Sequence, residues 1–356
     1  MSLSSTIRRR LRVGASIAAV AAAAITLSAC SADDSDSGST SESDASDASF
    51  GEITLQLSWI LNEEFSGEFI ADSSGYYTDA GFDKVNLVPG PSTGAAELLG
   101  GTADIAVSDA VAIGTAVANE DAPLKIIGTT YQENPFTVLS LKDGADIETP
   151  QDLIGKKIGV QDSNTSLFQA MLKANDIDPS EVTVVPVQYD PAPLVNGEVD
   201  GFIAYVTNEK ITVESEGYET ASLTMADNGL PFVAETITVT QDTIDNNPDM
   251  LKAFLKAEIQ GWTDQLADPQ KGVDLAINTY GADLGLDADK SLAGAEAQNE
   301  LITSDETDEN GIFTISDELQ QQTIDSLAGA GIDLDVSDLF DTSLVDAVYE
   351  ENPDLK

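Results

Sequence analysis

Residues 55–69 read LQLSWILNEEFSGEF, a strand pattern that runs directly into a helix pattern. Apolar side chains occupy every second position from two residues before this stretch: Ile53, Leu55, Leu57 and Trp59. Such alternation predicts a half-buried strand that ends near the tryptophan. Asn62 is placed to cap the helix that follows, and Glu63 and Glu64 in its first turn suit the positive end of the helix dipole.

The side chains at this junction have two interpretations. In the first, Trp59 and Phe65 belong to the hydrophobic core, and the two glutamates only stabilise the start of the helix. In the second, the indole, the amide and the carboxylates line a ligand site, because ligands of open α/β sheets bind at strand ends. These residues taken alone favour neither interpretation.

Strand and helix patterns alternate onward from this junction. The strand patterns are ITLQLSW, KVNLVPG, ADIAVSD and LKIIGTTY, separated by the helix patterns EEFSGEFIADSSG, TGAAELLGG and AVAIGTAVANE. A second alternating set begins near Phe136, a strand returns at ETITVTQD, and residues 245–356 are helical in pattern. This order predicts two α/β lobes, with lobe 1 formed by residues 51–134 and 235–356 and lobe 2 by residues 135–234. The ligand would bind in the cleft between them.

Two further strand ends carry polar groups. ADIAVSDA ends a strand at Ser108 and Asp109. IGVQDSNTSLFQAML places a run of polar residues at the start of a helix, where backbone N–H groups are free: Gln161, Asp162, Ser163, Asn164 and Thr165. Helix capping would explain one of these five residues, so the run favours a lining of hydrogen-bonding groups.

A third strand end, VDGFIAYVTNEK, places Tyr205, Asn208 and Glu209 just after an apolar strand. A carboxylate here could accept two hydrogen bonds from an amine or an amino-heterocycle. The rings of Tyr205 and Trp59 could stack on a flat ligand. A solvated turn is the alternative interpretation of the segment.

The amino-terminal segment predicts export. Four arginines, at positions 8, 9, 10 and 12, precede an apolar run over residues 13–27 that leads to LSAC, with Cys30 last. This pattern predicts a lipoprotein signal peptide over residues 1–29 and lipidation of Cys30, with an ordinary secretory signal as the alternative. Residues 30–50 are rich in serine and acidic residues, as expected of a disordered linker. Cys30 is the only cysteine, which excludes an intrachain disulfide and a cysteine-based metal site.

Composition excludes several functions. Without the four arginines the chain keeps 12 lysines and no histidine against 63 acidic residues, a formal charge of about −51. Such a chain cannot neutralise a run of phosphates, so nucleic acid is excluded as a partner. The absence of histidine removes Ser-His-Asp catalysis and histidine-bound zinc. Carboxylate chemistry remains, and a secreted carboxylate-dependent hydrolase is therefore a competing class.

Six segments together resemble a known family. They are LSWILN, GYYTDAGF, LLGGTADIAVSD, PQDLIGKKIGV, YDPAPLVNGEVDGFIAYVTNE and LFDTSLVDAVYEE. In order and spacing they resemble the NMT1/THI5-like periplasmic-binding proteins, which include receptors of thiamine-pyrimidine, riboflavin, nitrate and sulfonate importers. The resemblance implies a bilobed type 2 (Venus-flytrap) fold, no catalysis, no cofactor, and delivery of a small molecule to an ABC permease.

The resemblance also implies site residues. In pyrimidine-binding members a W-x-x-N segment, a tyrosine and a late glutamate line the pocket, and these match Trp59 with Asn62, and Tyr205 with Glu209. The candidate ligand-binding residues are thus Trp59, Asn62, Phe65, Ser108, Asp109, Gln161, Ser163, Asn164, Thr165, Tyr189, Tyr205, Asn208 and Glu209.

The chain departs from the family in two respects. Where such proteins commonly have proline and asparagine with a histidine a few residues on, this chain has Leu61, Asn62 and Phe65, which puts the ligand in question. The synthases of the family use a histidine and a cysteine-rich iron-binding motif. This chain has neither, so we do not expect a synthase.

The missing arginines bear on the ligand. Sulfonate, nitrate and carboxylate groups are bound best by a guanidinium, so these ligands are disfavoured, although backbone amides can also bind oxyanions. An acidic cleft with aromatic rings favours a flat, neutral or cationic, amine-bearing solute. Pyrimidine precursors of thiamine and flavins both fit this description, and a nitrate or sulfonate receptor stays an alternative.

One segment approximates a calcium-binding loop. ETDENGIFTISD, residues 306–317, has acids or amides at its first, third and fifth positions and Gly311 at its sixth. Its first residue is Glu, its last is the shorter Asp317, and NG is a common turn. A plain turn is therefore the preferred interpretation, and we predict no metal site.

These observations together predict a monomeric, lipid-anchored, extracytoplasmic substrate-binding protein of an ABC importer. Its partners would be a small solute and the transmembrane subunits of the permease, with the membrane reached only through Cys30. A purely adhesive surface module is a further competing class. It would show neither a deep cleft nor saturable binding of a small molecule.

Overall fold

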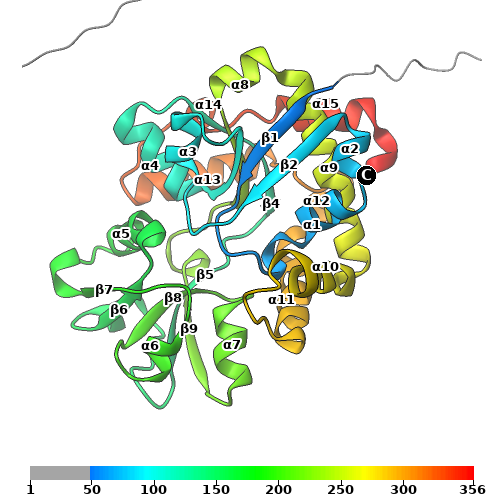
Figure 1. Ribbon diagram of the computed structural model, residues 1–356. Helices are drawn as coiled ribbons and strands as arrows, with labels where there is room; N and C mark the ends of the chain where they lie inside the picture. The colour runs from blue at the N-terminus through cyan, green and yellow to red at the C-terminus, as the bar shows by residue number, and fades with distance from the viewer. Residues whose placement is uncertain (1–48) are drawn as a thin grey trace, which may run out of the picture. The chain divides into compact units, whose positions relative to one another are not determined.

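A computed structural model describes residues 49–356 of the chain (Figure 1). The predicted signal peptide 1–29, the lipidation site Cys30 and nearly all of the predicted linker 30–50 lie outside these residues. The described chain forms two five-stranded sheets, each flanked by helices (Figure 1). The predicted two-lobed α/β architecture is therefore present, and each sheet with its helices is called a lobe below.

The first sheet has the strand order β2-β1-β3-β10-β4. Its strands are β1 (Gly51–Gln56), β2 (Phe82–Val88), β3 (Ile105–Asp109), β4 (Leu124–Tyr131) and β10 (Ala234–Thr240). β1 runs parallel to β2 and β3, whereas β10 is antiparallel to β3 and β4. The connecting helices are η1 (Glu63–Phe65), α1 (Ser66–Ser73), α2 (Tyr76–Asp79), α3 (Ala95–Gly100) and α4 (Ala110–Glu120). Central strand β3 is buried along its whole length, as its apolar sequence requires.

The second sheet has the strand order β7-β6-β8-β5-β9. Its strands are β5 (Phe136–Leu141), β6 (Lys157–Val160), β7 (Thr183–Pro186), β8 (Gly201–Tyr205) and β9 (Thr220–Thr224). β6 is parallel to β7 and β8, and β5 is antiparallel to β8 and β9. Its helices and 3-10 turns are η2 (Pro150–Leu153), η3 (Asp162–Asn164), α5 (Thr165–Ala174), η4 (Pro179–Glu181), α6 (Ala192–Val195), α7 (Glu209–Ser215) and η5 (Ala226–Asn228).

After β10 the described chain is helical, as predicted for residues 245–356. The elements are α8 (Gln241–Asn246), α9 (Pro248–Ala267), α10 (Pro269–Leu275), η6 (Ala276–Tyr280), α11 (Ala288–Ile302), α12 (Asp305–Asn310), α13 (Asp317–Gly329), α14 (Val336–Leu339), α15 (Ser343–Glu351) and η7 (Pro353–Leu355). The long helix α9 packs closely on α1, where a side-chain carbon at Gly261 would lie 2.3 Å from the backbone oxygen of Gly67. Two facing glycines thus bring these helices together backbone to backbone.

The chain passes between the two sheets twice, after β4 and after β9. The buried side chain of Asn134 in the first passage joins the two: its Nδ2 donates to the Leu230 carbonyl in the second passage at 2.9 Å. Its Oδ1 accepts from the Phe136 N–H at 2.8 Å, at the start of β5. One amide therefore ties both passages together.

Helix α11 of the first lobe also approaches the second lobe. Lys290 on α11 forms an ion pair with Glu216 beside α7 at 3.5 Å. A side-chain carbon at Gly294, one turn further along α11, would lie 2.7 Å from the Thr207 carbonyl oxygen. Glycine at this position therefore permits the contact between the lobes.

The calcium-loop pattern does not form a loop. Its first half lies in helix α12, which runs from Asp305 to Asn310, so the acids there cannot wrap around an ion as the residues of a calcium loop do. Across residues 49–356 no group of three or more acidic, histidine or cysteine side chains is arranged to hold a metal ion. No helix in the same range is both long and apolar enough to cross a membrane.

Candidate ligand-binding site

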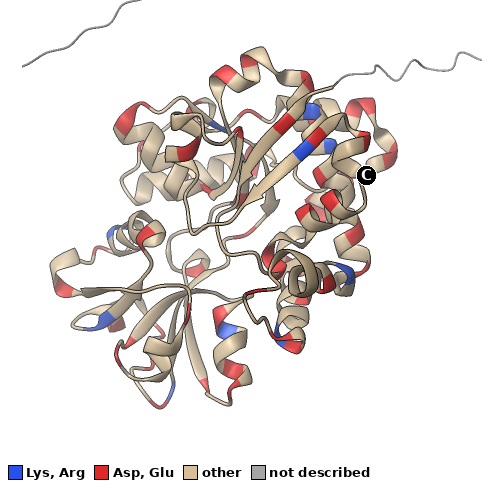
Figure 2. Ribbon diagram, viewed as in Figure 1, with Lys and Arg blue, Asp and Glu red and all other residues tan. Residues whose placement is uncertain are grey.

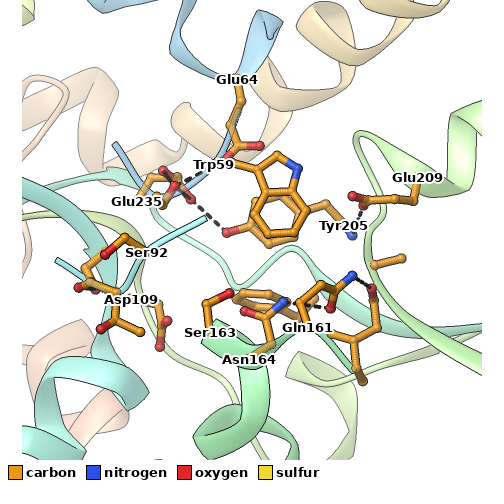
Figure 3. Close-up of a pocket in the computed structure, with 16 residues that line it drawn as sticks. Trp59, Glu64, Ser92, Asp109, Gln161, Ser163, Asn164, Tyr205, Glu209 and Glu235 are labelled. Carbon is orange, nitrogen blue, oxygen red and sulfur yellow. Dashed lines mark hydrogen bonds between the residues drawn. The ribbon is translucent and has the colours of Figure 1, made fainter. Parts of the chain in front are cut away.

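A cavity of about 500 Å³, partly open to solvent, is lined by residues of both lobes (Figure 3). Its walls are formed by Ser58, Trp59, Glu64, Ser92, Thr93, Ser108, Asp109, Phe136, Gln161, Ser163, Asn164, Ile203, Ala204, Tyr205, Glu209 and Glu235. Many of these residues lie at or just after the carboxyl ends of strands β1, β3, β6 and β8. This is the position where open α/β sheets bind ligands.

The structure brings eight of the predicted site residues to this cavity. They are Trp59, Ser108, Asp109, Gln161, Ser163, Asn164, Tyr205 and Glu209. Two others, Asn62 and Asn208, line a neighbouring cavity of about 370 Å³. Thr165 begins helix α5 and is not part of the cavity wall.

Two further predicted residues, like Thr165, line neither cavity. Phe65 is only 1% exposed and packs in the hydrophobic core. The helix begins with a single 3-10 turn, in which Glu64 faces the cavity while the next side chain turns inward. Tyr189 follows the edge strand β7 and is 44% exposed on the surface. Neither side chain is therefore among the residues that line the two cavities.

Asn62 also differs from its predicted role at the helix start. It occupies the N-cap position of η1, but its side chain makes no capping hydrogen bond. The side chain is 2% exposed, and its Oδ1 has no hydrogen-bond partner among the described residues.

Trp59 is held by a loop that follows β2. The Gly90 N–H donates to the Trp59 carbonyl at 2.6 Å, and the Ser92 N–H donates to the Ser58 carbonyl at 3.0 Å. A side-chain carbon at Gly90 would lie 2.3 Å from the Ser58 oxygen, so only glycine permits this approach. These bonds fix the backbone from which the indole and the Ser58 hydroxyl reach the cavity.

Tyr205 is fixed by three contacts at the end of β8. Its N–H donates to Glu209 Oε2 at 2.8 Å, and its hydroxyl donates to Glu235 Oε1 at 2.7 Å. Its ring meets that of Phe136 edge to face, with centroids 4.5 Å apart. The hydroxyl bond joins the second lobe to strand β10 of the first sheet, so this tyrosine spans the cleft.

The Ser58 hydroxyl lies between the carboxyl groups of Glu235 and Glu64. The Ser58 hydroxyl lies 3.1 Å from Glu235 Oε2 and 3.2 Å from Glu64 Oε1, and it can donate to only one of them at a time. Glu235 has a positive φ of 50° at an irregularity in the pairing of β10 with β3. Such bulges redirect side chains, and here the bulge turns a carboxylate into the cavity (Figure 3).

Burial raises the pKa of every carboxyl group in the cavity wall. Burial raises the pKa of Asp109 to about 6, although the N–H groups of Val111 and Ala112 donate to it and lower the pKa. Burial raises the pKa values of Glu209 and Glu235 to about 7. Burial and then the charge of Glu235 raise the pKa of Glu64 well above its ordinary value.

No positive charge offsets these acids, because none of the residues lining the cavity is a lysine. Acidic residues are spread over both lobes and lysines are few (Figure 2). The cavity therefore contains four buried carboxyl groups, part of them protonated near neutral pH. Such a wall suits groups that donate hydrogen bonds or carry positive charge.

The opposite wall is neutral and polar. Gln161 donates through Nε2 to the Ile203 carbonyl at 3.0 Å, and Asn164 donates to Gln161 Oε1 at 3.1 Å. The buried hydroxyl oxygen of Ser163 has no hydrogen-bond partner among the described residues. Gln161 is therefore fixed, whereas Ser163 is free to bond to a ligand.

The sequence did not single out half of the cavity wall. The residues missed are Ser58, Glu64, Ser92, Thr93, Phe136, Ile203, Ala204 and Glu235. Glu64 was part of a ligand site in only one of the two interpretations of its segment, and it was not chosen as a candidate. For Glu235 a signal exists, because a glutamate directly before the apolar run TITVT is out of place in a buried strand.

Comparison with known proteins places the chain in a family. A family model described as NMT1/THI5 like matches residues 62–272. Riboflavin-binding protein RibY of Chloroflexus aurantiacus is 26% identical over 244 residues, 64% of this chain and 66% of that protein. Formylaminopyrimidine-binding protein of Halalkalibacterium halodurans is 21% identical over 239 residues, 65% of this chain and 71% of that protein. Other relatives are named 4-amino-5-hydroxymethyl-2-methylpyrimidine phosphate synthases.

Solved structures share the fold. The periplasmic nitrate-binding protein NrtA of Synechocystis aligns with a TM-score of 0.61 at 14% identity, covering 85% of this chain and 90% of that chain. The periplasmic aliphatic sulphonate binding protein SsuA of Escherichia coli aligns with a TM-score of 0.60 at 14% identity, covering 79% and 91%. These alignments confirm the predicted periplasmic-binding-protein fold. Because the family match spans more than half of the chain, the protein belongs to the NMT1/THI5-like family.

Proposed function

We propose that the protein is the extracytoplasmic solute-binding protein of an ABC importer. Its solute would be small, flat and amine-bearing, similar to a pyrimidine precursor of thiamine. The observation that carries this proposal is the cavity between the lobes, where three aromatic side chains accompany four buried carboxyl groups and no lysine. The related riboflavin- and formylaminopyrimidine-binding proteins support the same class of ligand.

The contacts available in the cavity are sufficient for useful affinity. Stacking on Trp59 or Tyr205 would contribute about 0.5–1.5 kcal/mol beyond area burial. A hydrogen bond to a charged Glu209 would contribute about 1.5–3 kcal/mol. Two or three such contacts, together with the enclosure of apolar surface, offset the cost of closing the lobes and give a Kd of about 1 μM or lower.

The acidic wall argues against oxyanions. The structural relatives include receptors for nitrate and sulphonate, but anions in this cavity would meet four carboxyl groups without a compensating cation. Riboflavin, a flat and neutral heterocycle, is the alternative that the cavity chemistry and a relative both support.

We further propose that the protein is not an enzyme. Some relatives are named as synthases. The family resemblance implies that such synthases use a histidine and a cysteine-rich motif, and this chain has no histidine and a single cysteine. The remaining parts of the proposal are the permease as partner and a lipid anchor on Cys30. The anchor is supported by the arginine cluster, the apolar run and the LSAC segment that precede the described residues.

Calorimetric titration of the purified protein tests the proposal. We expect saturable binding of 4-amino-5-hydroxymethyl-2-methylpyrimidine or riboflavin, and no binding of nitrate or taurine. Glu209→Gln should weaken binding about tenfold, because it removes a charged acceptor. Glu198→Gln, an exposed glutamate of the same lobe, serves as the control and should bind like the parent protein. Failure of every probe to bind, or turnover of a bound one, would refute the proposed function.

A further inference from the structure

Three side chains at one end of the cavity form a cluster that the sequence did not indicate. Ser58 lies between Glu64 and Glu235, with its hydroxyl within 3.2 Å of an oxygen of each. The Tyr205 hydroxyl donates to Glu235 from the other side at 2.7 Å. Both glutamates are at most 6% exposed, yet both line the cavity.

We propose that the Glu64–Ser58–Glu235 cluster binds a positively charged group of the solute in exchange for a proton. Without a solute the two carboxyl groups share a proton, and the arriving cation releases it to solvent. The inference rests on the proposed solute-binding function and specifies the charge and the orientation of the solute. The balance is one cation in and one proton out at the cluster, with no bond formed or broken in the solute.

The surroundings of the cluster cannot supply the missing positive charge. The ionisable groups that face it from the adjacent elements are Glu63, Glu68, Asp109, Tyr131, Tyr205 and Glu209. All six are either acids or tyrosines, so none is cationic. Two ionised glutamates in contact with the same hydroxyl would repel each other without compensation. The pair by itself therefore retains a proton, and only a ligand can bring the countercharge.

The proton affinity of the pair agrees with this arrangement. Burial raises the pKa of Glu235 to about 7, and burial together with the charge of Glu235 raises the pKa of Glu64 well above its ordinary value. Both shifts favour the protonated form, which agrees with a pair that keeps a proton when no solute is bound. A cation beside it favours the ionised form, which lowers both pKa values and expels the proton.

The backbone is built to hold this cluster in place. Glu235 adopts a φ of 50°, which costs free energy for any residue other than glycine. Ser58 is fixed by the close approach of Gly90. An independent feature of the same cavity also indicates a ligand, because the buried Ser163 hydroxyl oxygen on the opposite wall has no partner among the described residues. A solute spanning the two walls would meet the cluster at one end and Ser163 at the other.

A matched pair of probes tests the exchange. 4-Amino-5-aminomethyl-2-methylpyrimidine carries an ammonium group at neutral pH, and its 5-hydroxymethyl analogue carries a neutral group at the same position. Calorimetric titration at pH 7 in phosphate and in Tris, two buffers of different ionisation enthalpy, counts the protons exchanged. We expect release of up to one proton with the aminomethyl probe and close to none with the hydroxymethyl probe. The affinity for the aminomethyl probe should fall up to about tenfold per unit as the pH is lowered from 7 to 5.5.

Variants assign the proton to the cluster. The double variant Glu64→Gln/Glu235→Gln should abolish proton release and the preference for the aminomethyl probe, and each single variant should reduce both, because the remaining carboxyl group is still buried. Glu209→Gln, which also changes a cavity carboxyl, should weaken both probes but retain the release. Binding of the aminomethyl probe to the parent protein without proton release, or release that survives in the double variant, would overturn the inference while leaving the solute-binding function intact. Failure of both probes and riboflavin to bind would instead reject the proposed function, and the inference with it.

Discussion

A buried acid outside the cavity makes the stability of the protein depend on pH. Glu258 on helix α9 is fully buried, and the Tyr77 hydroxyl donates a hydrogen bond to one of its oxygens. Its other oxygen has no partner among the described residues. Burial raises the pKa of Glu258 from its ordinary 4.5 to about 8. We predict that Glu258→Gln stabilises the protein at neutral pH. Glutamine has nearly the same shape and does not ionise, so the folded state need not keep a proton on this side chain.

The magnitude follows from the difference in proton binding between the two states. Between pH 4.5 and about 8 the folded protein keeps the proton of Glu258 and the unfolded chain loses it. The free energy of unfolding therefore falls as the pH rises, by about 1.4 kcal/mol per unit, which amounts to about 3 kcal/mol at pH 7. Below pH 4.5 both states are protonated and this loss disappears. The glutamine side chain of the variant binds no proton in either state, so the variant lacks this decline.

Urea unfolding at pH 5, 6, 7 and 8, followed by tryptophan fluorescence, measures the effect. The free energy of unfolding of the variant, relative to that of the parent protein, should increase by about 1 kcal/mol with each pH unit. The altered hydrogen bond would add only a constant offset to this difference. Glu296→Gln, at an exposed position on α11, is the control, and its difference from the parent should stay within about 0.5 kcal/mol. A difference between Glu258→Gln and parent that is constant from pH 5 to 8 would refute the reasoning, since the side chain would then not hold its proton in the fold.

Three further substitutions test the packing and the site. Trp59→Ala should weaken binding of 4-amino-5-hydroxymethyl-2-methylpyrimidine by about 1 kcal/mol in calorimetry and leave the urea midpoint unchanged, because the indole is half-buried at the cavity; equal affinity would remove it from the site. Gly67→Ala places a carbon 2.2 Å from the Trp262 ring, so the free energy of unfolding should drop by about 1–3 kcal/mol, and an unchanged midpoint would contradict this packing. Gly294→Ala places a carbon 2.7 Å from the Thr207 oxygen across the cleft. It should increase the radius of gyration in small-angle scattering and weaken probe binding, and it fails as a prediction if both stay at the parent values.

Periodicity was sufficient to predict nine of the ten strands of the fold. The alternation at Ile53 and Leu55 predicts β1, and the segment ADIAVSD predicts β3. β9 was not predicted, because its sequence TASLT is only weakly apolar. It forms an edge strand by pairing with β5. Edge strands are determined by tertiary pairing more than by their own sequence.

The site was predictable only where strands end regularly. Trp59, Asp109 and Tyr205 lie at such ends, and the sheets bring them to one cavity. Glu235 points inward because of a positive φ within a strand irregularity, which a pattern of apolar residues does not encode. The 3-10 turn at the start of α1 similarly exchanges the expected orientations, so that Phe65 enters the core.

The amide of Asn134 limits how the protein can move. Because it bonds both chain passages between the sheets, the two cannot lengthen or slide independently. We expect the lobes to move relative to each other mainly by rotation about this point, on the microsecond to millisecond scale usual for domain hinges. Under the proposed function, torsion about this single pivot would open the cavity and release the solute with every strand intact.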